Sequence, residues 1–146
     1  MKIRSCVILL MILTLYACKE ADDRNTSIFK SYLQKEFKAE IPDSLHYYIL
    51  IPKMLCKGCS VNTLSELEQL ITSENEHRFT FISTNERFSQ EFKKVKFYEY
   101  DVHGKLDELD LDIANVTIVK TQAGKVIFIK PIYIDEKRSL SEIITF

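Results

Sequence analysis

One uninterrupted apolar run, His46-Tyr-Tyr-Ile-Leu-Ile51, constrains the fold of this chain more than any other segment. The run is short, rich in aromatic and β-branched residues, and shows no alternation of apolar and polar positions. Such a run is typical of a strand buried on both faces, as in a parallel sheet covered by helices. The sequence therefore predicts an α/β domain with three layers, in which helices flank a central sheet.

The remaining elements alternate helices with strands around this buried strand. Asn25 or Thr26 is expected to cap a helix before it, and Pro42 is expected to stop that helix. A helix after it is predicted by five apolar residues at helical spacing: Val61, Leu64, Leu67, Leu70 and Ile71. Further strands are expected at Phe79–Ser83, Phe97–Asp101, Val116–Lys120 and Lys125–Lys130, and further helices at Arg87–Lys94, Lys105–Asp112 and from Ser139. Thr121-Gln-Ala-Gly124 predicts a hairpin between the last two strands, with Gly124 at positive φ, so the sheet is expected to be mixed.

Composition excludes several classes of protein. The 146 residues, 46% of them apolar, fit a single globular domain. The balance of 20 Lys+Arg against 21 Asp+Glu provides no basic surface for a nucleic-acid partner. With 3 Gly and 3 Pro, the chain is neither fibrous nor low in complexity. It contains no P-loop, dinucleotide fingerprint or Ser/His/Asp order, so no cofactor is expected.

The first 17 residues have the features of a signal peptide. Lys2 and Arg4 precede an apolar run over residues 7–17, which is shorter than the roughly 20 residues of a membrane span. The run ends in Leu15-Tyr-Ala-Cys18, which resembles the lipobox of bacterial lipoproteins, in which the cysteine is acylated and becomes the first residue.

The lipobox resemblance implies a division of the chain and a location. Residues 1–17 would be a lipoprotein signal peptide, 18–25 a lipidated tether and 26–146 the folded domain. Acyl chains such as palmitate on Cys18 would attach the protein to a membrane. The expected location is the cell envelope, as an outer-membrane lipoprotein that faces the periplasm or the cell surface. A plain signal peptide and an uncleaved anchor are the alternatives.

The chemistry of the chain centres on Cys56-Lys-Gly-Cys59, which lies between the buried strand and the next predicted helix. Two cysteines at this spacing can form a disulfide across the first turn of a helix. The helix N-terminus and Lys57 stabilise a thiolate, so Cys56 is the expected nucleophile and Cys59 the resolving cysteine. A redox-active Cys56–Cys59 disulfide is therefore predicted. A purely structural disulfide is an alternative, although so short a loop contributes little stability.

From about His46 to Ile134, the order of elements resembles a thioredoxin-like domain of the branch that includes TlpA-type and peroxiredoxin-like lipoproteins. The resemblance includes the strand before the Cys pair, the helix after it, the Phe97-Tyr-Glu-Tyr-Asp101 strand and the hairpin at Gly124. It implies a thioredoxin-like fold and a thiol-disulfide oxidoreductase. The partners would be protein thiols or disulfides and an unknown redox partner.

Three positions depart from that family and leave enzyme activity open. Leu55 stands in place of an aromatic residue, and Leu50 in place of a buried acid. Val116 and Thr117 stand where the family has a proline that faces the cysteines. A noncatalytic binding lipoprotein on the same fold is therefore the main alternative.

A copper carrier is the other alternative. Met54-Leu-Cys56-Lys-Gly-Cys59 resembles the Met-x-Cys-x-x-Cys loop of copper chaperone domains, and soft thiolates select Cu(I). Met54, Cys56 and Cys59 would then be metal ligands. A single CxxC supplies only two of the four ligands of a structural zinc site, so zinc is not expected.

The other polar and aromatic residues have structural explanations. His46 is expected in a strand, His77 in a loop and His103 in a turn. An acidic cluster lacks calcium-loop spacing and is interpreted as a solvated helix face; it comprises Asp107, Glu108, Asp110 and Asp112. Four tyrosines are expected to pack within strands: Tyr47, Tyr48, Tyr98 and Tyr100.

Overall fold

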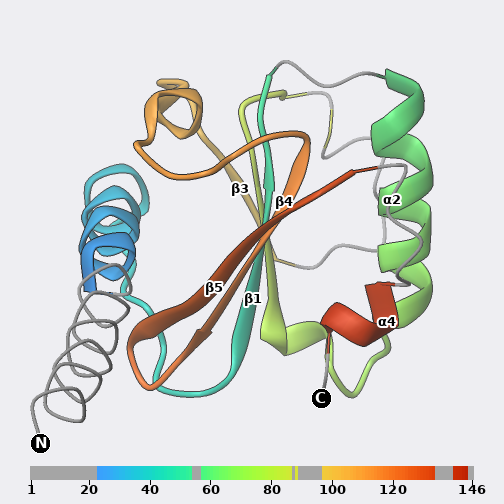
Figure 1. Ribbon diagram of the computed structural model, residues 1–146, viewed down its shortest axis with the longest axis horizontal. Coiled ribbons are helices and arrows are strands. Elements are labelled where there is room, and N and C mark those ends of the chain that lie inside the picture. Colours follow the sequence, from blue (N-terminus) through green and yellow to red (C-terminus); the bar gives the residue numbers. More distant parts are fainter. Residues whose placement is uncertain (1–22, 54–56, 87, 89–96, 134–139, 145–146) are drawn as a thin grey trace, which may run out of the picture.

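The computed structural model describes residues 23–53, 57–86, 88, 97–133 and 140–144, with residues 57–61 described by their backbone alone. In this part of the chain a mixed sheet of five strands lies between helices on its two faces (Figure 1). The predicted α/β class with a central mixed sheet flanked by helices is confirmed, and the arrangement is compatible with three layers. No helix within the described residues is long and apolar enough to cross a bilayer.

The sheet has the order β3-β2-β1-β4-β5. Its strands are β1 (His46–Ile51), β2 (Phe79–Ser83), β3 (Tyr98–Tyr100), β4 (Val116–Gln122) and β5 (Lys125–Ile132). The first three strands are parallel, whereas β4 is antiparallel to β1 and β5 is antiparallel to β4. The observed bounds of β1 and β2 match the predicted strands. The predicted strand Phe97–Asp101 is shorter by one residue at each end, and the last two strands each extend two residues further.

Helices cover both faces of the sheet. A helix over residues 23–37 and the 3₁₀ helix η2 (Lys105–Glu108) lie on one face. On the other face lie α2 (Lys57–Leu70) and the short α4 (Leu140–Ile143) (Figure 1). A second 3₁₀ helix, η1 (Glu76–Arg78), directly precedes β2. The predicted helix at Arg87–Lys94 and the predicted start at Ser139 lie mostly or wholly outside the described residues.

Burial of β1 on both faces produces two apolar cores. Tyr47, Ile49 and Ile51 face Leu64 and Leu67 of α2 in the first core. The second core contains Tyr48 and Leu50 from β1, packed with residues of the 23–37 helix, η2 and the neighbouring strands: Phe29, Tyr32, Leu33, Leu106, Ile82 and Val119. The absence of alternation in the His46–Ile51 run therefore reflects two cores, as predicted.

The first helix differs from its prediction at both ends. Residues 23–25, assigned above to the tether, are helical, so neither Asn25 nor Thr26 caps the helix. The hydroxyl of Thr26 instead accepts a hydrogen bond from the Val126 N–H at 3.1 Å. The helix ends well before Pro42, where Lys38 adopts a left-handed φ of 57° and the Ala39 N–H bonds the Leu33 carbonyl.

The β4–β5 hairpin closes through two residues at positive φ, Ala123 at 53° and Gly124 at 70°. Such a pair matches the right-handed twist of the strands it joins. The amide of Ala123 donates to the Asp43 carbonyl at 2.8 Å, and the Gly124 amide donates to the Pro42 carbonyl at 3.3 Å. These bonds hold the hairpin turn beside the chain that leads into β1, and the predicted role of Gly124 is confirmed.

Candidate functional site

The predicted Cys pair follows the carboxyl end of β1. β1 ends at Ile51 and α2 begins at Lys57, so Cys59 belongs to the first turn of α2. Cys56 and its neighbours Met54 and Leu55 lie outside the described residues, as does Cys18. The side chain of Cys59 is not described either. The described backbone therefore shows which strand precedes the pair and which helix follows it, but it does not describe the side chains of the pair.

Two strands flank this end of β1. The Thr84 N–H, directly after β2, donates to the Ile51 carbonyl at 3.4 Å. On the other side, Leu50 pairs with Thr117 near the start of β4. The chain that leads to Cys56 therefore leaves the sheet between the end of β2 and the start of β4. This is the kind of edge, beside a change in strand direction, at which α/β proteins place their sites.

A threonine-based turn occupies the place where the resembled family has its proline. The Thr117 hydroxyl donates to the Ala114 carbonyl at 2.9 Å and accepts from the Ala114 N–H at 3.2 Å. Between them Asn115 has a φ of 53°, and no peptide bond among the described residues is cis. The start of β4 is thus stabilised by its own side-chain contacts.

Leu50 is fully buried in the core beneath the 23–37 helix, so an apolar contact replaces the buried acid of the resembled family. Among the described residues the buried carboxylate is Asp101, which directly follows β3 and is 2% exposed. Its Oδ2 accepts the Tyr32 hydroxyl at 3.1 Å and the Leu106 N–H at 2.6 Å. Its Oδ1 is buried without a hydrogen-bond partner in the described part of the chain.

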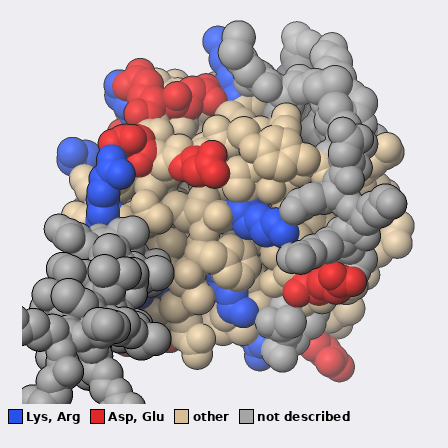
Figure 2. Space-filling model, in the orientation of Figure 1, with Lys and Arg blue, Asp and Glu red and all other residues tan. Residues whose placement is uncertain are grey.

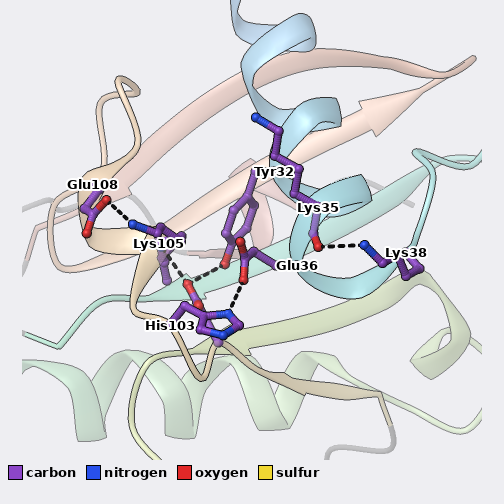
Figure 3. A network of polar contacts seen from close by, with 9 residues as sticks. Tyr32, Lys35, Glu36, Lys38, His103, Lys105 and Glu108 are labelled. Atoms are coloured by element: carbon purple, nitrogen blue, oxygen red, sulfur yellow. Dashed lines mark hydrogen bonds and ion pairs between the residues drawn. The ribbon is translucent and has the colours of Figure 1, made fainter.

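Tyr32 is the link between this carboxylate and the first helix. Burial, followed by the charge of Asp101, raises the pKa of Tyr32 well above its ordinary value. The phenol therefore remains protonated and donates to Asp101. In Figure 3 the Tyr32 ring points from its helix toward the segment that carries Lys105 and Glu108.

The four acids of the predicted acidic cluster are exposed, as the interpretation as a solvated helix face requires, and three of them also make polar contacts. Asp107 Oδ1 accepts the Lys53 N–H at 3.0 Å, Glu108 pairs with Lys105 at 2.6 Å, and Asp110 pairs with Arg24. Figure 2 shows acidic side chains gathered over this segment, with Lys or Arg side chains beside them. Local spacing had no signal for these contacts, because two of the three partners lie 54 and 86 residues away.

The histidines occupy structural positions. His46 Nε2 lies 2.9 Å from Thr80 Oγ1, and burial, with a smaller effect of His77, lowers the pKa of His46 to about 4. His77 lies in η1 rather than in a loop, and His103 lies in a turn 2.7 Å from Glu36 (Figure 3). His46 begins β1, whose six residues span roughly 20 Å, and the Cys pair follows the other end. No group of three or more His, Cys, Asp or Glu residues within the described ranges could hold a metal ion.

A groove of about 500 Å³ lies between the first helix and η2. Its lining residues are Ser27, Ile28, Ser31, Tyr32, Lys35, Glu36, Lys105, Glu108 and Leu109. Glu36 pairs with His103 and Glu108 with Lys105, whereas Lys35 makes no ion pair within the described chain. Hydroxyl groups and charged side chains therefore line an otherwise partly apolar groove. Tyr32, Lys35 and Glu36 of this lining are labelled in Figure 3.

Comparisons of the chain with protein-family models, curated proteins and solved structures found no significant match.

Proposed function

We propose that this protein is a membrane-anchored, thioredoxin-like lipoprotein that exchanges thiols and disulfides through Cys56 and Cys59. The observation that carries the proposal is the position of Cys56, which immediately precedes the first residue of α2 at the carboxyl end of β1. Unpaired N–H groups and the dipole at a helix N-terminus stabilise a thiolate. A cysteine in this setting has a substantial fraction of thiolate near neutral pH, and the thiolate is the nucleophile.

The reaction needs only the two cysteines and a protein disulfide. The Cys56 thiolate attacks one sulfur of the substrate disulfide, forms a mixed disulfide and releases the other substrate sulfur as a thiolate. Cys59 loses its proton and attacks Cys56, which releases the second substrate thiolate. The substrate gains two electrons and the protein is left with a Cys56–Cys59 disulfide, which an electron donor must reduce. The opposite direction oxidises a dithiol substrate.

The order and direction of the strands support the thioredoxin-like interpretation. A strand–Cys-pair–helix unit leads into the parallel strand β2, and an antiparallel hairpin of β4 and β5 follows. The resemblance stated from the sequence implies this succession of elements. Asp101, the last residue of the predicted strand, directly follows β3 and is buried, which supports the resemblance.

The described residues that follow the proposed anchor and those that precede the proposed redox pair lie at opposite ends of the sheet. The start of the first helix contacts the β4–β5 hairpin, through the Asp23–Lys125 ion pair and the Thr26–Val126 bond. The hairpin end of β4 pairs with His46, the first residue of β1, whereas the Cys pair follows the last. Cys18 precedes Asp23 by five residues, which reach at most roughly 18 Å. An acylated Cys18 would therefore keep the hairpin end near the bilayer and the Cys pair toward water.

A trapping experiment on the protein purified from membranes tests the proposal. In Cys59→Ser the second step is absent, so this variant should accumulate mixed disulfides through Cys56 and should lose insulin reduction. Cys56→Ser, the matched control, should form no such adducts. Wild-type protein that neither reduces insulin in the presence of dithiothreitol nor yields adducts in Cys59→Ser would contradict the proposal.

A noncatalytic binding lipoprotein is the second candidate, and two observations favour it. Buried Leu50 stands where the resembled family has the acid that takes a proton, and the groove beside Tyr32 has the size of a small-molecule site. Lys35, which makes no ion pair among the described residues, and the partly apolar lining suit a small amphipathic anion. Wild-type function in a variant with both Cys56 and Cys59 changed to alanine would favour this candidate over exchange.

A further inference from the structure

The groove between the first helix and η2 has two walls that run in opposite directions. Arg24, near the start of the helix, pairs with Asp110, two residues after η2. Glu36, near the end of the helix, contacts His103, two residues before η2. The groove therefore follows most of the helix, and its outermost lining positions there, Ser27 and Glu36, are roughly 13 Å apart along the axis.

Both walls are fixed to the apolar core. Tyr32 lines the groove from the helix, is 4% exposed, and donates its hydroxyl to Asp101 Oδ2 at 3.1 Å. Leu106 of η2 is 1% exposed, and its N–H donates to the same oxygen at 2.6 Å. One buried carboxylate thus joins the two walls. The groove is therefore preformed, as small-molecule sites usually are.

The lining of the groove changes along its length. Ile28 and Leu109, both half-buried, provide apolar surface toward the end at which Arg24 and Asp110 pair. Toward the other end the lining carries two ammonium groups and two carboxylates, from Lys35, Glu36, Lys105 and Glu108 (Figure 3). A ligand that fills the groove therefore needs an apolar part and a charged part.

The charged part of the lining is complementary to a ligand that carries both signs. Lys35 makes no ion pair within the described chain. The side chains of Lys105 and Glu108 are 47% and 64% exposed, so their ion pair contributes little and either group can turn to a ligand. A simple anion would meet the carboxylates of Glu36 and Glu108, and a simple cation would meet two ammonium groups. A zwitterion finds an opposite charge for each of its own.

We propose that this groove binds a free α-amino acid with a large apolar side chain. Lys35 takes the carboxylate of the ligand, Glu36 takes its ammonium group, and Ile28 and Leu109 contact its side chain. The volume of about 500 Å³ is sufficient for such a molecule. The groove lies on the face of the sheet opposite α2 (Figure 1).

NMR titration of the ¹⁵N-labelled protein, purified from membranes in detergent, tests the proposal. L-leucine should shift amide signals of residues 27–36 and 105–109, with a Kd of about 1 mM or tighter. Three analogues each lack one part of leucine: isocaproate lacks the ammonium group, isoamylamine lacks the carboxylate, and glycine lacks the apolar side chain. Each should bind at least about tenfold more weakly, because a charge-assisted hydrogen bond or the apolar contact is lost.

Substitutions in the lining should match the analogues. Lys35→Gln should weaken binding of L-leucine about tenfold and leave binding of isoamylamine unchanged, because isoamylamine has no carboxylate to lose. Glu36→Gln should likewise weaken L-leucine and leave isocaproate unchanged. Lys30→Gln is the matched control, since Lys30 is an exposed lysine of the same helix outside the lining. It should bind L-leucine as the wild type does.

Three results would overturn the inference. The first is a titration with L-leucine that leaves the signals of the groove unchanged. The second is binding of isocaproate or isoamylamine as tight as that of L-leucine, since the groove would then accept a simple anion or a simple cation. The third is equal weakening by Lys35→Gln and Lys30→Gln.

The inference goes beyond thiol-disulfide exchange and involves neither cysteine. It specifies the ligand of the second candidate function as a zwitterion instead of a simple anion. Cys56→Ser should therefore bind L-leucine with the affinity of the wild type. A protein that exchanges disulfides and binds no amino acid would refute this inference and leave the proposed exchange intact.

Discussion

Replacing Cys18 with serine is expected to abolish acylation of the chain and its cleavage after Ala17. The reason is chemical, because the proposed lipid is attached to this cysteine, and each acyl chain contributes about 0.8 kcal/mol of membrane affinity per buried CH₂. Cells grown with a labelled fatty acid should place label on the wild-type protein and none on Cys18→Ser. Mass spectrometry of the N-terminal peptide should show a lipid-modified residue 18 in the wild type alone.

Cys6→Ser is the matched control, since Cys6 lies in the same proposed signal peptide. This variant should retain both the label and the start at residue 18. An unlabelled wild-type protein that begins elsewhere would contradict the lipid anchor and indicate a plain signal peptide. A full-length wild-type chain in the membrane fraction would instead indicate an uncleaved anchor.

The second large effect concerns His46 and acid stability. The pKa of His46 is lowered from an ordinary 6.5 to about 4, first by burial and then by His77. Between these two pH values the unfolded chain binds more protons than the folded one. The contribution of His46 to the free energy of unfolding is therefore fully present above about pH 6.5 and falls as the pH drops toward 4. At pH 4.5 the loss from this residue should be about 2 to 3 kcal/mol.

His46→Gln should remove this loss, because glutamine does not titrate and can still bond Thr80. Urea unfolding at pH 7.5 and pH 4.5 measures the difference, and His103→Gln controls for an exposed histidine. The wild type and His103→Gln should lose about 2 to 3 kcal/mol more on acidification than His46→Gln does. Equal losses in all three proteins would show that His46 does not carry the effect.

Patterns that reflect burial could be predicted from the sequence. The apolar run at His46–Ile51 and the strand Phe79–Ser83 match the observed strands, and the predicted stripe of α2 buries Leu64 and Leu67. These predictions succeed because each residue's environment follows from the period of its own element. Gly124 was predictable for a similar reason, since a two-residue hairpin turn needs positive φ.

Contacts between distant segments could not be predicted in this way. Thr26 has the chemistry of an N-cap, yet its hydroxyl accepts from Val126, 100 residues away, and the helix begins earlier. Asp107 belongs to an acidic cluster that is exposed, as predicted, and it also accepts a hydrogen bond from the backbone of Lys53. Both polar side chains satisfy backbone groups of other elements, and no local pattern identifies which ones.

The candidate site also has local features, which the sequence predicts, and non-local ones, which it does not. The spacing of Cys56 and Cys59 and their place between a strand and a helix are local features, so the sequence alone identifies the pair. The polar contacts elsewhere in the fold are not local: Tyr32 of the first helix donates to Asp101, which follows β3, and Asp107 of η2 accepts from the backbone of Lys53. The sequence pattern predicts Asp101 only as the end of a strand, whereas its burial depends on contacts between distant segments.

The reduction potential of the Cys56–Cys59 pair, measured in the intact protein by equilibration with glutathione buffers, tests the central claim most directly. An exchanging pair should have a potential between about −270 and −120 mV, the range from thioredoxin to a strong disulfide oxidant. The thiol pKa of Cys56 should then be about 7.5 or lower. A potential below about −300 mV would mark a structural disulfide and contradict thiol-disulfide exchange as the function.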